Sequence, residues 1–373
     1  MILYQGLLSS PASWARVGRG YLGGMLRAGT DVAAVITRGF RYDPDFPLPP
    51  GLPMMSLPER RTVSPPEIGL GFLHPPHLER LIGDYKANLF VWESNRVPPS
   101  WAEKLKRETD VVLVPSRFTQ QALIETGVPA DQVAVVPYGY SELIEIVADR
   151  CSRDPSANPP DRPFTYLVVA APHWRKGIRE LCRAFADTFS KSDDVVLRIK
   201  TTYDPATAKR RFPFEIPSWD SLFKQCGLCE SGSPRVELMV RTHTDAEMLE
   251  LYAQADVYVG PSWGESFGLA ILDAMAMGLP VIANGWGGQT EFIPSTDDLV
   301  DFELSDRQEG LYESADAALV AIPSVASIAG RLRWHFENQE ASRQIGESCR
   351  KSATPRTWDV ASVELLRVLD RRV

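Results

Sequence analysis

The stretch from Asp256 to Gly288, DVYVGPSWGESFGLAILDAMAMGLPVIANGWGG, constrains the fold of this chain more than any other. A short apolar segment leads through a Pro/Gly/Ser loop into an apolar segment of helical length, which Gly278 and Pro280 end before a second short apolar segment. This order predicts a strand, a helix over residues 267–277 and a second strand, all within an open parallel sheet. Ligands of such sheets bind beyond the carboxyl ends of the strands, where a helix N-terminus favours an anion. The loop is therefore the candidate ligand site.

Two acids stand in this unit, Glu265 in the loop and Asp273 eight positions later in the predicted helix. Eight helical residues rise about 12 Å, whereas the paired carboxylates of a hydrolytic centre lie roughly 5 to 9.5 Å apart. The spacing suits an elongated polyhydroxyl ligand held at both ends, with a diphosphate between them over the helix N-terminus. The plainer alternative is that Glu265 is a loop charge and Asp273 a solvated helix residue.

The pattern Pro-Ser-x-x-Glu-Ser-Phe-Gly-Leu, then an acid at the eighth position, then Ala-Met-x-x-Gly-Leu-Pro-Val-Ile closely resembles the donor-site motif of family 4 glycosyltransferases. The resemblance implies an α/β protein of the GT-B fold, in which two Rossmann-like domains face a central cleft. It assigns the hexose hydroxyls of a nucleotide sugar to Glu265 and the ribose hydroxyls to Asp273. The family usually has Glu at the second position, so the shorter Asp273 leaves a ribose contact through water open. The other donor-binding residues that the motif implies are Gly264, Ser266, Phe267, Gly268 and Leu269.

A second stretch, TDVVLVPSRFTQQALIETGVPADQVAVVPYGY from Thr109 to Tyr140, resembles the last unit of the family's N-terminal domain. Residues 148–163 are polar and Pro-rich, as expected of a linker between domains. We therefore predict an acceptor domain over residues 1–150 and a donor domain over 151–354. The resemblance implies that a C-terminal helix within 355–373 crosses back to the acceptor domain.

Two adjacent cations, Arg175 and Lys176, follow a predicted strand and precede Gly177 and an amphipathic helix. At that place they can neutralise a diphosphate, and Arg can do so with two parallel hydrogen bonds. A solvated basic helix start is the alternative, although cations there oppose the helix dipole by about 0.3 to 1 kcal/mol each. The resemblance assigns the leaving diphosphate to Lys176 directly and to Arg175 less directly, because Ala170 and Ala171 stand where the family commonly has Gly-Arg. It also implies that the loop near Thr242 contacts the nucleotide base.

The N-terminal part offers weaker signals. Gly18 and Gly20 are predicted to precede a helix that ends near Gly29, so that their backbone can approach a ligand, with packing as the alternative. His74 and Glu93 fall at the ends of two predicted strands, where acceptor-side groups gather. We treat His74 as a candidate catalytic residue and Glu93 as a candidate acceptor contact, against purely structural roles for both.

Two further motifs favour plain explanations. Asp43-Pro44-Asp45 matches the metal-binding triplet of the other main glycosyltransferase fold, but it lies in the proline-dense segment 42–66, which we predict to be a surface connection. Cys226 and Cys229 could supply half of a zinc site, yet no second ligand pair is near in sequence. Residues 204–234 receive no assignment.

Composition limits the partners. The 373 residues have a formal net charge of -8, which argues against nucleic acid as a partner. There is no apolar run of membrane-spanning length and no secretory leader pattern, and the five cysteines suit a reducing compartment. We expect a cytoplasmic protein without a transmembrane segment, and contact with a membrane surface stays open.

The sequence therefore predicts a retaining, metal-independent glycosyltransferase without a cofactor. It would move a hexosyl group from a nucleoside diphosphate sugar to a hydroxyl of a sugar or glycoconjugate acceptor, for example in polysaccharide biosynthesis. The alternatives are a sugar-nucleotide epimerase of similar fold and a degenerate nucleotide-sugar-binding subunit, and the presence of both Glu265 and Lys176 speaks against the second. An NAD-dependent dehydrogenase would need G-x-G-x-x-G after a strand, which neither predicted Rossmann unit provides.

Overall fold

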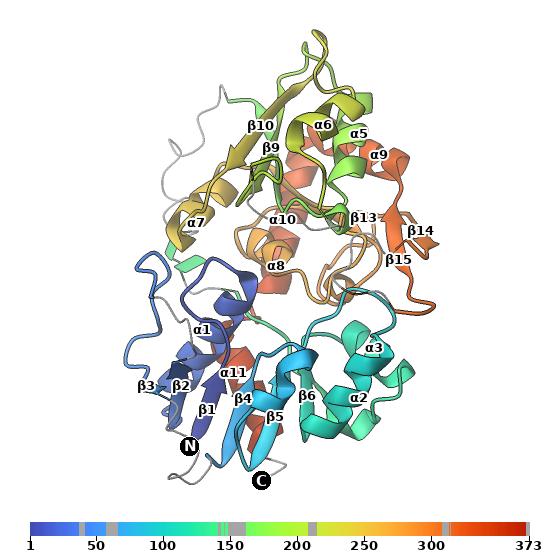
Figure 1. Cartoon of the computed structure of the whole chain (residues 1–373). Coiled ribbons are helices and arrows are strands. Elements are labelled where there is room, and N and C mark those ends of the chain that lie inside the picture. The colour runs from blue at the N-terminus through green and yellow to red at the C-terminus, as the bar shows by residue number, and fades with distance from the viewer. Residues whose placement is uncertain are drawn as a thin grey trace. The chain divides into compact units, whose positions relative to one another are not determined.

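Two compact units make up the structure, Met1–Ser141 with Arg356–Val373, and Glu142–Pro355. The computed structural model in Figure 1 describes residues 1–36, 42–56, 66–140, 143–144, 146–147, 162–207, 215–307, 313 and 315–370. Over these ranges, no helix is both long and apolar enough to cross a lipid bilayer.

The first unit is built on a parallel sheet of seven strands in the order β3-β2-β1-β4-β5-β6-β7. The strands are β1 (Ile2–Gln5), β2 (Val32–Ile36), β3 (Met54–Ser56), β4 (Ile68–Gly71), β5 (Tyr85–Leu89), β6 (Val111–Val114) and β7 (Val133–Val135). The connecting helices are α1 (Ser13–Arg27), η1 (Pro75–Arg80), α2 (Pro99–Glu108), α3 (Arg117–Glu125) and η2 (Ala130–Gln132). Strands β1, β4 and β6 are buried along their whole length, so their sequences do not alternate between apolar and polar residues, and only Gln5 at the end of β1 is polar.

Two predictions for this unit are wrong. Residues 54–56 form the edge strand β3, paired with β2, inside the segment that we expected to be a surface connection. The prolines around this short strand conceal it, since an edge strand tolerates them. Helix α1 begins at Ser13, so Gly18 and Gly20 lie inside it and do not precede it.

The glycines of α1 allow close packing. A Cβ on Gly18 would lie 2.4 Å from the Tyr4 hydroxyl, and one on Gly20 would lie 2.2 Å from the ring of Trp358. Trp358 begins α11 (Trp358–Asp370), which contacts α1 and is adjacent to it in Figure 1. The C-terminal helix thus belongs to the first unit, and packing accounts for both glycines.

Gly20→Ala is expected to lower the free energy of unfolding by about 1 to 3 kcal/mol, the usual cost of overpacking, even though alanine is the better helix former. Gly23→Ala in the same helix is the matched control, because its Cβ would meet only the flexible end of Arg27 at 3.3 Å. Chemical denaturation should therefore show a lower free energy of unfolding for Gly20→Ala than for the wild type, and a higher one for Gly23→Ala. A stabilised Gly20→Ala protein would contradict the packing of α1 on α11.

The second unit is built on a parallel sheet of six strands in the order β10-β9-β8-β11-β12-β13. The strands are β8 (Phe164–Val169), β9 (Val195–Thr201), β10 (Arg235–Val240), β11 (Val257–Gly260), β12 (Val281–Asn284) and β13 (Leu299–Val300). The helices are η4 (Trp174–Lys176), α5 (Ile178–Thr188), α6 (Trp219–Gln225), α7 (Asp245–Ala253), α8 (Leu269–Ala276), η5 (Gly288–Glu291), α9 (Val325–Glu337) and α10 (Gln339–Ala353). An antiparallel pair, β14 (Phe302–Ser305) and β15 (Val320–Pro323), stands beside this sheet, and α6 lies in the segment that received no assignment.

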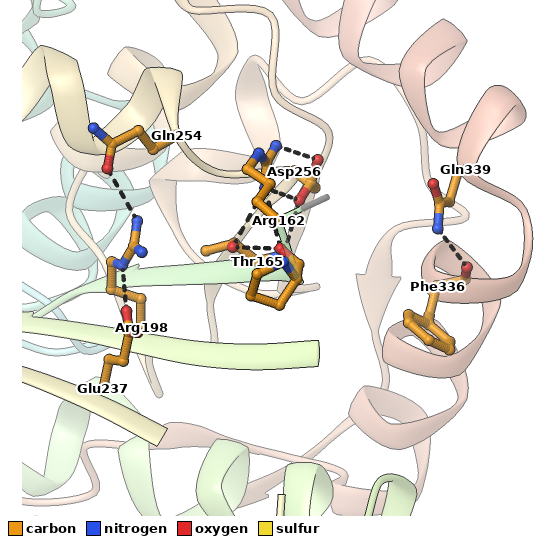
Figure 2. A network of polar contacts seen from close by, with 9 residues as sticks. Arg162, Thr165, Arg198, Glu237, Gln254, Asp256, Phe336 and Gln339 are labelled. Atoms are coloured by element: carbon orange, nitrogen blue, oxygen red, sulfur yellow. Dashed lines mark hydrogen bonds and ion pairs between the residues drawn. The ribbon is translucent and has the colours of Figure 1, made fainter. Parts of the chain in front are cut away.

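Ion pairs tie this sheet together away from the candidate site. At the amino ends of the strands, Arg162 makes hydrogen bonds of 2.6 and 2.7 Å to the two carboxylate oxygens of Asp256, which also accepts from the amide of Thr165 (Figure 2). On β9, Arg198 lies between Glu237 of β10 and Gln254 at the end of α7 (Figure 2). Arg198 therefore marks the face of the sheet that α7 covers.

Candidate active site

The candidate site of the second unit lies where the strand order reverses, between β8 and β11. Ligands of open α/β sheets bind at such a switch point. The two loops contact each other through the amide of Trp263, which donates to the carbonyl of Arg175 at 2.7 Å. Between them stands Gly177, whose φ is +64° and whose added Cβ would lie 2.0 Å from the carbonyl oxygen of Pro261. Only glycine fits there, so the Lys-Gly pair is a structural requirement of the site.

Glu265 is clamped by the groups that the sequence singled out. Its Oε1 accepts from Lys176 Nζ at 2.5 Å and from Ser262 Oγ at 2.7 Å, while Arg175 Nη1 lies 3.8 Å away and donates to the carbonyl of Gly264 at 2.7 Å. Burial alone would raise the pKa of Glu265, but the charges of Lys176 and Arg175 and the hydrogen bonds outweigh it and lower the pKa. Glu265 is therefore a carboxylate at neutral pH.

A third loop, after β12, supports the backbone of Glu265. The amide of Gly288 donates to its carbonyl at 2.8 Å. Gly287 has a φ of +119°, and a Cβ there would lie 3.0 Å from the same carbonyl. These two glycines were not predicted to belong to the site, although Gly-Trp-Gly-Gly directly after the buried strand β12 is a signal for close backbone approach.

Helix α8 begins at Leu269, two residues later than predicted, because Gly268 has a left-handed backbone with φ of +96°. Ser266 and Phe267 precede it and are buried. Asp273 is 3% exposed, so the alternative of a solvated helix residue is wrong. Burial, followed by the charges of Glu265 and Asp273, raises the pKa of Tyr258. Both acids thus lie near the same buried tyrosine, on the face of the sheet opposite to the core that includes Val257 and Val259.

The loop after β10 borders the same edge of the sheet. Thr242 is exposed there, whereas His243 is buried and its Nε2 accepts from Arg241 Nε at 3.1 Å. Thr244 caps α7 in a reciprocal capping box with Glu247. Thr242 is therefore accessible on a well-fixed loop.

His74 lies at the switch point of the first unit, between β1 and β4. Its ring centroid is 4.4 Å from that of Trp14 on α1 and 5.7 Å from that of Trp101 on α2. Trp14 also stacks on Phe72 at 5.2 Å with an interplanar angle of 14°. Burial, with a smaller contribution from His77, lowers the pKa of His74, so the imidazole is neutral at pH 7. The sequence does not reveal this aromatic cluster, because its members come from separate elements.

The structure also places the remaining motifs, and the acceptor contact of Glu93 stays a prediction. Asp43 Oδ1 accepts from the amide of Asp45 at 3.0 Å in a local turn, and Glu93 is half-buried after β5. Cys226 is buried while Cys229 is exposed. No group of three or more His, Cys, Asp or Glu side chains that could hold a metal ion occurs within the ranges that the structure describes.

The second unit is similar in sequence to known glycosyltransferases. Residues 163–319 match the family of glycosyl transferases group 1. A sulfoquinovosyl transferase of Arabidopsis thaliana is 30% identical over 123 residues, which are 32% of this chain and 20% of that protein. A D-inositol 3-phosphate glycosyltransferase of Rhodococcus opacus is 33% identical over 159 residues, 40% of this chain and 34% of that protein. The chain thus spans about a fifth to a third of the length of these two curated relatives.

Solved structures extend the likeness to nearly the whole chain. HepE of Anabaena, in complex with UDP and glucose, has a TM-score of 0.68 at 14% identity, with 99% of both chains covered. Sucrose-phosphate synthase of Thermosynechococcus elongatus has a TM-score of 0.71 at 18% identity, with 99% of this chain and 98% of that chain covered. The match of residues 163–319 to the glycosyl transferases group 1 agrees with the resemblance that the motif indicated, and the fold of the chain is GT-B.

Proposed function

We propose that the protein is a retaining glycosyltransferase, which moves a hexosyl group from a nucleoside diphosphate sugar to a hydroxyl of a sugar or glycoconjugate acceptor. The observation that carries this proposal is the clamp of Lys176, Arg175 and Ser262 around the buried carboxylate of Glu265 at the switch point. It joins a sugar-binding acid to two cations suited to a diphosphate, and the family match supports the same activity.

In the proposed reaction, the donor lies along the carboxyl edge of the second sheet. Glu265 accepts hydrogen bonds from hexose hydroxyls, and Asp273 binds the ribose, directly or through water. The bond between the anomeric carbon and the diphosphate breaks, and its electron pair passes to the leaving oxygen. The acceptor oxygen bonds to the same carbon on the same face, and its proton passes to the departing diphosphate.

Catalysis would rest on stabilising the charge that builds on the leaving diphosphate. Lys176 and Arg175 are cations already held in place, and the first amides of α8 add the positive end of a helix dipole. We propose that these groups replace a metal ion. Keeping Glu265 ionised beside Lys176 also avoids leaving either charge unpaired before the donor binds.

A donor panel tests this proposal. Calorimetric titration with UDP-, GDP- and ADP-sugars in excess chelator should reveal binding of one nucleotide class, with the matching free diphosphate binding as well. Failure of all three classes to bind in chelator, followed by binding once Mg²⁺ or Mn²⁺ is added, would contradict the metal-free role of the two cations.

The aromatic cluster of Trp14 and His74 is the candidate acceptor side. The half-buried ring of Trp14 at a switch point offers an apolar face to a sugar ring, and the neutral imidazole of half-buried His74 can exchange hydrogen bonds with the sugar hydroxyls. This supports a carbohydrate acceptor without identifying the sugar.

Trp14→Ala is expected to lower the acceptor-stimulated rate about twofold to tenfold, which corresponds to the roughly 0.5 to 1.5 kcal/mol of an aromatic contact. Release of nucleoside diphosphate is measured with and without a panel of p-nitrophenyl glycosides as acceptor probes. Trp14→Phe, which retains a ring, should recover most of the stimulation. A parallel loss of acceptor-free hydrolysis in Trp14→Ala would remove this cluster from the acceptor side.

A further inference from the structure

Lys200 is a buried cation at the edge of the second sheet that the proposed reaction does not yet use. It is the penultimate residue of β9 and only 7% exposed. Its neighbours in register are Val169 on β8 and Met239 on β10, neither of which can compensate a charge. Burial lowers the pKa of this lysine, as expected for an ammonium group removed from water.

In the part of the chain that the structure describes, no carboxylate pairs with Lys200. Among the described residues, Lys200 Nζ has no hydrogen bond and no ion pair with an acid, in contrast to Arg198, which lies two positions earlier and is bound by Glu237. The titratable neighbour whose pKa responds to Lys200 is His243. Burial lowers the pKa of His243, and the positive charges of Arg241 and Lys200 lower it further. Buried lysines are rare unless paired, and no acid in the described part of the chain pairs with this one, so its ammonium group is available to an anionic ligand.

The position of Lys200 in the sheet suggests that partner. The four strands β10, β9, β8 and β11 are neighbours in this order, and their carboxyl ends lie along one edge of the sheet. In the same order, that edge holds Thr242 after β10, Lys200 on β9, Arg175 and Lys176 after β8, and Glu265 after β11. An elongated donor with its sugar at Glu265 and its base near Thr242 would pass Lys200 between them.

The face of the sheet agrees with this placement. Alternate residues Val195, Leu197 and Ile199 belong to the core cluster on one face, so Lys200 lies on the other. Arg198 lies on the same face as Lys200 and donates to Gln254 at the end of α7 (Figure 2). Tyr258, beside Asp273, also lies opposite to that core cluster.

We propose that Lys200 is a third donor-binding cation, which binds the phosphate groups of the nucleoside diphosphate from the side of β9. This inference rests on the proposed function and adds a residue to it. Ala170 and Ala171, after β8, lack a charge, and the amide of Ala170 donates to the Lys200 carbonyl at 3.0 Å. Lys200 on β9 can thus supply the positive charge that the turn of Ala170 and Ala171 lacks.

Lys200→Met tests the proposal, because methionine keeps the length of the buried stem and removes the charge. Calorimetric titration with UDP, GDP and ADP, and with uridine, guanosine and adenosine, separates phosphate from nucleoside contacts. The affinity for the preferred diphosphate should fall about tenfold to a hundredfold, the range for one charge-assisted hydrogen bond, while the affinity for the matching nucleoside changes less than about twofold. Lys200→Arg should recover part of the lost affinity.

Stability separates this role from simple packing. Without ligand, Lys200→Met should unfold at the same temperature as the wild type or higher, because an uncompensated buried charge is removed. Lys191→Met, at an exposed position of the same unit, is the control and should change neither the unfolding temperature nor the affinity for the diphosphate. If the wild type binds a nucleoside diphosphate and Lys200→Met binds it with the same affinity, the inference about Lys200 is overturned while the proposed function stands. A wild type that binds none of the three diphosphates overturns the proposed function as well.

Discussion

Replacing Glu265 by glutamine is expected to lower turnover about a hundredfold to a thousandfold, the effect of removing one group that acts in the transition state. The buried carboxylate accepts from Lys176 and Ser262, and glutamine keeps its shape but loses its charge. The affinity for free nucleoside diphosphate should change less than about threefold, since the proposed partner of Glu265 is the hexose. Steady-state release of nucleoside diphosphate and calorimetry measure the two quantities.

Asp273→Asn provides the contrast to Glu265→Gln. Asp273 lies on α8 and is assigned to the ribose. Its substitution should therefore weaken the binding of the free nucleoside diphosphate as well as that of the nucleotide sugar. Glu250→Gln, at an exposed position on α7, is the control for an amide in place of an acid. Equal losses of diphosphate affinity in the Glu265 and Asp273 variants would contradict this division of roles.

Replacing Lys176 by methionine is the second change with a large expected effect. Lys176 makes a 2.5 Å hydrogen bond to Glu265 and is proposed to stabilise the leaving diphosphate. Turnover should fall about a hundredfold, and diphosphate affinity about tenfold, because Arg175 remains in place. Lys176→Arg should retain more activity than Lys176→Met, since the charge is kept.

The pH profile distinguishes this loss from a packing defect. The charge of Lys176 helps to lower the pKa of Glu265, so the carboxylate ionises at lower pH in the wild type than in Lys176→Met. The acidic limb of the rate profile, which reports protonation of Glu265, should therefore shift to higher pH in the variant. An unshifted limb would show that the Glu265 carboxylate does not limit the rate at low pH.

Local patterns in the sequence predicted much of the donor half. The motif from Asp256 to Gly288 forms β11, α8 and β12 as expected, because apolar runs of these lengths, separated by Gly and Pro, have few other folds. The ion pair of Lys176 with Glu265 joins residues 89 positions apart, and no local pattern could predict its geometry. It became visible only once the sheet order placed β8 beside β11.

The prediction for the glycines of α1 failed for a physical reason. A glycine is ambiguous in sequence, since it suits both a loop near a ligand and a helix packed against another element. Gly20 makes room for Trp358, which lies far along the chain, and the sequence around it contains no sign of that contact. The ring contact of Trp14 with His74 likewise depends on tertiary structure, although His74 alone could be placed at a strand end.

The most direct test of the central claim is acceptor-free turnover of the nucleotide sugar that binds best, followed in excess chelator. The wild type should release nucleoside diphosphate and a free sugar whose anomeric configuration, read by NMR in the first minutes, is that of the donor, and Glu265→Gln should show almost no release. Release of a sugar with inverted anomeric configuration, or equal rates in the wild type and Glu265→Gln, would contradict a retaining transfer at this site.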